Sequence, residues 1–141
     1  MRIGVIKASR PGESRVALAP ASCKQLAQSG FPSSIESGAG REAVFADEAY
    51  RDAGATVDAD PAAVLGAAEI VLKVQAPAAD ATARDEIRWM RPGTILVGSL
   101  MPTRNLEAIR ALADRRVTAF STDAIPRTTR AQAMDTLSSM A

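Results

Sequence analysis

The sequence contains no histidine, one cysteine and few aromatic residues. Without histidine, a catalytic triad built on an imidazole, a histidine general base and a zinc site with histidine ligands are all excluded. The single cysteine, Cys23, cannot form a disulfide within the chain, which fits a reducing compartment. We interpret Cys23 as a buried structural thiol rather than a nucleophile, and we expect no metal site.

A charge of one dominant sign and a long hydrophobic run are also missing. Lys and Arg number 17 against 16 Asp and Glu, a formal net charge of +1, which provides no basic surface for nucleic acid. No stretch approaches the roughly 18–20 apolar residues that a membrane helix requires. The apolar run at residues 1–7 is too short for a signal peptide. We therefore expect a soluble cytoplasmic protein, which could still dock on a membrane partner.

Short apolar runs alternate with amphipathic stretches along the whole chain. Strands in alternation with helices predict a doubly wound, mostly parallel α/β sheet of the Rossmann or flavodoxin-like kind. At 141 residues the chain has the length of one domain, spanning 1–141. The patterns predict strands at 2–7, 33–36, 55–57, 69–74, 94–98 and 117–121, and helices at 20–27, 47–52, 61–66 and 105–115. The last of these helices should be capped by Thr103 and should face inward with Leu106, Ile109, Leu112 and Ala113.

The glycine-rich fingerprint of dinucleotide-binding proteins is absent. Gly38-Ala39-Gly40 is a lone G-x-G that is followed by Arg41 rather than by a spaced third glycine. We interpret it as a tight turn. The chain has no P-loop either, so the main binding site for the phosphates of any dinucleotide would lie elsewhere.

Two basic residues stand at positions where an anion could bind. Lys73 lies in the otherwise apolar strand expected at 69–74, and a lysine there must either reach water or have a partner, because an unpaired buried charge is costly. Arg15 lies in the loop after the first strand. Both are near the carboxyl ends of strands, so a small anion could lie between them, held by the guanidinium fork and the ammonium. A lysine at a strand end is also often simply exposed, and this alternative stays open.

The last fifteen residues, 127–141, predict a helix with two parallel stripes. Thr129 and Gln132 have the spacing of a capping box, so the helix should begin at Thr129. An apolar stripe should face the core and consists of Ala131, Met134, Leu137 and Ala141. A polar row runs beside it and consists of Gln132, Asp135 and Ser138, with Arg127 standing just before the cap.

The polar row has two interpretations. It can be only the solvated face of an amphipathic helix. Alternatively, an arginine, an amide, a carboxylate and a hydroxyl at a helix N-terminus can orient a polar or phosphorylated ligand. The segment follows the strand expected at 117–121, and open α/β sheets bind ligands beyond the carboxyl ends of their strands, which favours the ligand site. The pattern stops at Ala141 without a stop signal, so we expect that the chain is cut there.

Several segments, in the same order as here, resemble the shared N-terminal domain of alanine dehydrogenase and proton-translocating nicotinamide nucleotide transhydrogenase. They are residues 1–5, 13–20, 36–40, 52–55, 70–74 and 91–94. Alanine dehydrogenases carry a catalytic histidine soon after the strand corresponding to 94–98, whereas residues 96–103 here contain none. Transhydrogenases place an apolar residue and a proline there, as in 100–102. Residues 123–139 resemble the transhydrogenase α subunit almost residue for residue.

The resemblance implies a function in nicotinamide nucleotide transhydrogenation. It implies that Arg127, Gln132, Asp135 and Ser138 contact NAD(H) near its nicotinamide, with Gln132 and Asp135 as the expected catalytic residues. Arg15 and Lys73 match the positions that hold the substrate carboxylate in alanine dehydrogenases. A transhydrogenase has no such substrate, so a structural or vestigial pocket is expected for these two residues.

The resemblance also implies partners. They are a second, Rossmann-type NAD-binding subdomain beyond residue 141, a component that binds NADP(H), and a membrane-spanning component that couples hydride transfer to proton translocation. A homodimer on the inner face of the cell membrane is expected. Two alternatives remain: the substrate domain of an alanine-dehydrogenase-like enzyme, which the missing histidine opposes, and a non-catalytic docking module.

Overall fold

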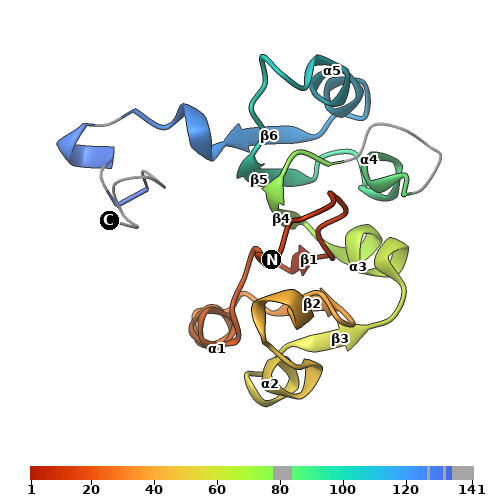
Figure 1. Cartoon of the computed structure of the whole chain (residues 1–141), viewed down its shortest axis with the longest axis vertical. Helices are drawn as coiled ribbons and strands as arrows, with labels where there is room; N and C mark the ends of the chain where they lie inside the picture. The colour runs from red at the N-terminus through yellow and green to blue at the C-terminus, as the bar shows by residue number, and fades with distance from the viewer. Residues whose placement is uncertain (78–83, 127, 132, 135–141) are drawn as a thin grey trace.

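The computed structural model describes residues 1–77, 84–126, 128–131 and 133–134 (Figure 1). Its strands are β1 (Ile3–Val5), β2 (Ser33–Glu36), β3 (Thr56–Asp58), β4 (Ile70–Gln75), β5 (Ile95–Ser99) and β6 (Thr118–Ser121). Its α-helices are α1 (Pro20–Gln28), α2 (Asp47–Asp52), α3 (Pro61–Ala67), α4 (Glu86–Trp89) and α5 (Leu106–Asp114). Three short 3-10 turns complete the described elements: η1 (Arg41–Ala43), η2 (Thr122–Ala124) and η3 (Thr129–Ala131).

The strands form one six-stranded sheet in the order β3-β2-β1-β4-β5-β6. Every pairing in it is parallel. This is the strand order of the Rossmann fold, so the predicted fold class is confirmed. The order reverses between β1 and β4, where Ile3 faces Ile70 and Val5 faces Leu72. Ligands of such sheets bind in the crevice at this switch point, beyond the carboxyl ends of the strands.

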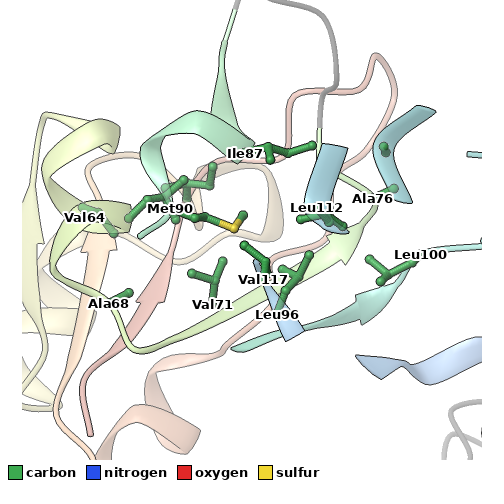
Figure 2. Packing of buried hydrophobic residues seen from close by; sticks show 13 residues of the cluster. Val64, Ala68, Val71, Ala76, Ile87, Met90, Leu96, Leu100, Leu112 and Val117 are labelled. Carbon is green, nitrogen blue, oxygen red and sulfur yellow. The ribbon is translucent and has the colours of Figure 1, made fainter. Parts of the chain in front are cut away.

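Two hydrophobic clusters cover the two faces of the sheet. Along β4, Val71 belongs to the cluster that includes α3, α4 and α5, whereas its neighbours Ile70 and Leu72 pack against the cluster of α1 and α2. This alternation follows from the two-residue period of a strand. Figure 2 shows the first cluster, with Val71 and Leu96 among side chains from α3, α4 and α5 and beside Val117, which precedes β6. In Figure 1, α1 and α2 lie on the side of the sheet opposite α3, α4 and α5.

Proline and glycine mark the ends of several helices. Pro20 and Pro61 each begin a helix, and Asp60 caps α3 by accepting a hydrogen bond from the Ala62 N–H at 3.0 Å. Gly30 and Gly54 follow α1 and α2 with φ of 87° and 90°. This left-handed backbone favours glycine and ends a helix.

The predicted N-cap of α5 is wrong, and so are two of the residues predicted for its inward face. The N-cap is Asn105 rather than Thr103, and Leu106 is exposed, as is Ala113. The buried residues of α5 are Ala108 and Leu112, because packing in the cluster that includes Leu96 of β5 and Val117 selects a stripe turned away from Leu106.

The sequence patterns did not predict α4. Its four residues, Glu86–Trp89, are too few to display a helical period.

The last strand is exposed on both faces in the described part of the chain, since Thr118, Ala119 and Phe120 are all exposed. The register of β5 and β6 sets Phe120 beside Val97, and Ala119 beside the buried Leu96 on the other face. Phe120 is 58% exposed, although parallel sheets are normally covered on both faces. The cover that α1 and α2 give to β1–β3 therefore does not extend to β6.

The chain continues past β6 through η2 and η3 (Figure 1). Where a helix was predicted from Thr129, the structure describes the 3-10 turn Thr129–Ala131. Ala131 is buried as expected, but Met134 is exposed, which contradicts its predicted place in the core. Leu137 and Ala141 lie outside the described residues. Among the described residues no helix is long and apolar enough to cross a membrane.

Candidate functional site

The carboxyl ends of β1 and β4 line a small cavity at the switch point of the sheet. Its polar lining includes Ser9, Arg10, Arg15, Lys73 and Gln75, so the structure brings the two predicted cationic residues to one place. The cavity measures about 10 Å³. This is room for about one water molecule, and a carboxylic acid substrate does not fit without rearrangement.

A bulge at the end of β4 marks the position of Lys73. The register of β4 against β5 shifts between Leu72 and Gln75. Gly98 of β5 allows it, because a Cβ at this position would lie 2.5 Å from the backbone oxygen of Lys73. Bulges locally re-aim a side chain and are frequent beside functional sites.

Lys73 forms a buried ion pair with Glu86, the first residue of α4. Its Nζ lies 2.9 Å from Oε2 of Glu86, and the two side chains are 5% and 0% exposed. The sequence predicts that Lys73 either reaches water or has a partner, and the structure shows a partner.

A second ion pair lies beside the first. Arg84 donates to both carboxylate oxygens of Glu36, at 3.2 and 2.7 Å, and its Nε lies 3.8 Å from Oε1 of Glu86. The guanidinium carbon also lies 5.9 Å from the ring centroid of Trp89. The four charged groups balance one another and tie the start of α4 to the end of β2.

Glu36 stands where a Rossmann fold places the acidic residue that binds the cofactor ribose, at the end of β2. Here its carboxylate is engaged by Arg84 and also accepts the backbone N–H of Lys7 at 2.7 Å.

Arg15 is held by a neighbour in its own loop. Its Nε and one terminal nitrogen donate to the two carboxylate oxygens of Glu13, each at 2.8 Å. The hydrogen bond from Arg15 lowers the pKa of Glu13 to about 2, and Glu13 in turn raises the pKa of Arg15. Each cation of the predicted anion pocket therefore already has a carboxylate partner, and an incoming anion would compete with it.

The Gly38-Ala39-Gly40 segment is the tight turn that the sequence predicts. Gly38 has φ of 81°, and its N–H donates to Oδ1 of Asp47 at 2.8 Å. The hydroxyl of Ser37 donates to the same carboxylate, which lowers the pKa of Asp47. A Cβ at Gly40 would lie 2.7 Å from the ring of Tyr50, so close packing requires the second glycine.

The polar groups at the switch point do not suit the phosphates of a dinucleotide. No glycine-rich loop follows β1, the acidic residue at the end of β2 is paired, and the Gly38 N–H is used within the turn. The described residues of this sheet therefore do not form a cradle for the phosphates of NAD.

The chain leaves β6 through a set of side-chain hydrogen bonds to the loop after β5. The Ser121 hydroxyl accepts the Leu100 N–H at 3.1 Å and donates to Asp123, whose Oδ1 also accepts the Met101 N–H at 3.2 Å. The bond from Ser121 lowers the pKa of Asp123. Asn105, the N-cap of α5, donates to the carbonyls of Leu100 and Met101 in the same loop, at 2.8 and 3.3 Å.

The predicted cofactor-contacting residues Arg127, Gln132, Asp135 and Ser138 lie outside the described residues. Sequence reasoning missed the residues Glu36, Arg84, Glu86 and Asp123. Glu86 is 13 positions from Lys73, and nothing local marks such a pair in the sequence. In the described part of the chain, no group of three or more His, Cys, Asp or Glu side chains could hold a metal ion.

With this fold and site, the chain belongs to the family described as the alanine dehydrogenase/PNT N-terminal domain, which matches residues 4–141. It is 41% identical over 141 residues to the NAD(P) transhydrogenase subunit alpha of Cereibacter sphaeroides, covering 100% of this chain and 26% of that protein. It is 38% identical over 125 residues to the alanine dehydrogenase of Bacillus subtilis, covering 89% of this chain and 32% of that enzyme.

A solved structure agrees with the fold throughout. The crystal structure of transhydrogenase from Sinorhizobium meliloti superposes with a TM-score of 0.89 at 39% identity, covering 99% of this chain and 40% of that one. The chain thus spans well under half the length of the relatives that it matches. It is homologous to the N-terminal portion of the transhydrogenase α subunit.

Proposed function

We propose that this chain is the N-terminal domain of the NAD(H)-binding component of a proton-translocating NAD(P) transhydrogenase. Its role is to position NAD(H) for direct hydride transfer to NADP⁺ and for the reverse reaction. The observation that carries the proposal is the 41% identity to a transhydrogenase α subunit over 100% of the chain.

The described site supports a positioning role rather than a phosphate-binding role. Because the switch point lacks a phosphate cradle, the proposal assigns the phosphates to another region of a longer subunit. This chain then contributes the polar side chains of Arg127, Gln132, Asp135 and Ser138, which would bind and orient the nicotinamide end. The hydride chemistry belongs to the nucleotide, and the protein sets its place and orientation.

The partners follow from the same proposal. A second NAD-binding subdomain, a component that binds NADP(H) and a membrane-spanning component would complete the enzyme. The domain would be peripheral on the inner face of the cell membrane, and the assembly would contain two copies of it.

An alanine-dehydrogenase-like activity is the second candidate, supported by the 38% identity to the Bacillus subtilis enzyme. Two observations oppose it. The chain contains no histidine to act where those enzymes carry theirs, and Arg15 and Lys73 are both paired around a cavity of about 10 Å³.

The test is made on the full-length subunit combined with the NADP(H)-binding component. We expect Gln132→Ala and Asp135→Ala to slow hydride transfer about tenfold or more, since misplaced reactants lose rate steeply. Gln25→Ala and Asp52→Ala, on exposed positions of α1 and α2, are the controls and should leave the rate unchanged.

Two results would contradict the proposal. If the subunit does not change the fluorescence of NADH, or if both site variants transfer hydride at the wild-type rate, the assignment fails. Oxidation of L-alanine with NAD⁺ by the wild-type subunit would favour the dehydrogenase instead.

A further inference from the structure

The hydrogen bonds at the end of β6 lie directly before the stretch that the proposed function assigns to the cofactor. Asp123 is four positions before Arg127, and it joins the outgoing chain to the loop that follows β5. Among the described residues after β6, Asp123 is the last whose side chain is hydrogen-bonded to the body of the domain.

The loop after β5 is a firm anchor for this connection. Leu100 is buried in the core, and the carbonyls of Leu100 and Met101 both accept from Asn105, which precedes α5. Arg10, from the loop after β1, donates to Oδ1 of Asn105 at 3.0 Å. The loop is therefore tied to the core, to α5 and to the loop after β1.

Met101 gives a second observation at the same point. It has φ of 44°, a left-handed backbone that residues other than glycine rarely adopt. Such strain persists only where surrounding contacts fix it, and it occurs preferentially at functional sites. Here the N–H of the strained residue is the group that Asp123 accepts.

We propose that Asp123 is a positioning residue of the cofactor site. By holding the Met101 N–H and the Ser121 hydroxyl, its carboxylate fixes the direction in which the chain leaves β6. The chain therefore reaches Pro126, directly before the segment that the proposed function assigns to NAD(H), along one defined path. The inference rests on the proposed function, because it acts through the segment that this function assigns to NAD(H).

The experiment compares Asp123→Ala with Asp123→Asn in the full-length subunit combined with its NADP(H)-binding partner. The alanine variant should lower kcat for hydride transfer about ten- to a hundredfold, the range expected for a displaced reacting group, while the Kd for NADH changes much less. The asparagine variant keeps an oxygen that can accept the Met101 N–H, so its kcat should stay close to that of the wild type. Asp114→Ala, on the exposed end of α5, is the matched control and should change neither quantity.

Thermal unfolding separates positioning from folding. The midpoint of the asparagine variant should stay near that of the wild type, so this variant and Ser121→Ala remain informative if the alanine variant does not fold. In that event, a slowed Ser121→Ala with an intact midpoint supports the inference. A Ser121→Ala variant with unchanged kcat overturns it.

A double variant with Gln132→Ala shows whether Asp123 acts through the segment. The effect of Asp123→Ala should shrink or vanish when Gln132 is already replaced, whereas fully additive effects would overturn the inference. If Gln132→Ala slows transfer and Asp123→Ala does not, the positioning role alone fails. If Gln132→Ala has no effect, the proposed function of the segment fails first. Equal losses for the alanine and asparagine variants of Asp123 would also overturn the role, since only one of them lacks the acceptor.

Discussion

Lys73 and Glu86 form an ion pair that is almost completely withdrawn from water, with 2.9 Å between the ammonium nitrogen and a carboxylate oxygen. The pair lies at the point where the order of the strands reverses. Removing two charges from water costs several kcal/mol for each, and their attraction offsets this cost only while both are present. The pair therefore locks α4 onto β4 without adding much net stability.

Removing one member of this pair should be far more damaging than replacing both. Glu86→Leu alone leaves the buried ammonium of Lys73 without its carboxylate and should lower the free energy of unfolding by about 3–5 kcal/mol. Lys73→Met should cost less, because Glu86 keeps its contact with Arg84 at 3.8 Å. The double variant should recover most of the loss. Urea unfolding followed by circular dichroism measures all three. Glu48→Gln, which breaks the exposed pair with Arg51, is the control and should cost less than about 1 kcal/mol.

Two glycine-to-alanine changes should have opposite effects on the free energy of unfolding. Gly98→Ala forces a Cβ against the backbone oxygen of Lys73 and should destabilise the protein by about 1–3 kcal/mol. At Gly66, in α3, the nearest atom to a new Cβ is 3.9 Å away, so Gly66→Ala should stabilise by about 0.5–1 kcal/mol through better helix propensity. Chemical denaturation decides the signs, and a neutral Gly98→Ala would show that β5 can move away from the bulge.

Val44 should be replaceable with a gain in stability. It has φ of 65° and is 91% exposed, so it bears left-handed strain without burying its side chain. Val44→Gly should gain about 0.5–1 kcal/mol, because relief of roughly 1–2 kcal/mol of strain exceeds the added entropy of the unfolded chain. The thermal unfolding midpoint should rise. Lys24→Gly, in the exposed interior of α1, is the control and should lower it.

The pair of Arg15 and Glu13 should make stability depend on pH in the acid range. The pKa of Glu13 is lowered from 4.5 to about 2 in the folded protein, so its contribution is complete above pH 4.5 and is lost as the pH falls toward 2. The difference in unfolding midpoint between wild type and Glu13→Gln should accordingly be largest near neutral pH and vanish near pH 2. A difference that persists unchanged at pH 2 would mean that packing, not charge, accounts for the effect.

Strands bounded by turn residues were predictable from local sequence, and contacts between distant residues were not. The strand at 33–36 was predicted with its observed bounds, and the turn around Gly38 that follows it was visible in the sequence. The inward face of α5 was wrong because Leu106 and Ala108 are both apolar, and only packing against the sheet selects between them. In the candidate site, too, local features were predictable and contacts between distant residues were not. The chemistry of Arg15 and Lys73 marked them in the sequence, whereas their carboxylate partners became visible only when the chain was folded.

The strand order has a consequence for how the domain is made. Of the six strands of this sheet β1 comes first along the chain, yet it lies inside the sheet, between β2 and β4. A growing chain can pair β1 with β2 early, but the other edge of β1 stays open until β3, α3 and β4 have followed. Closing such a long loop is slow, and an unpaired apolar strand is exposed to wrong partners meanwhile. Completion of β4 is therefore the event in synthesis that seals the centre of the sheet and, with it, the place where the site forms.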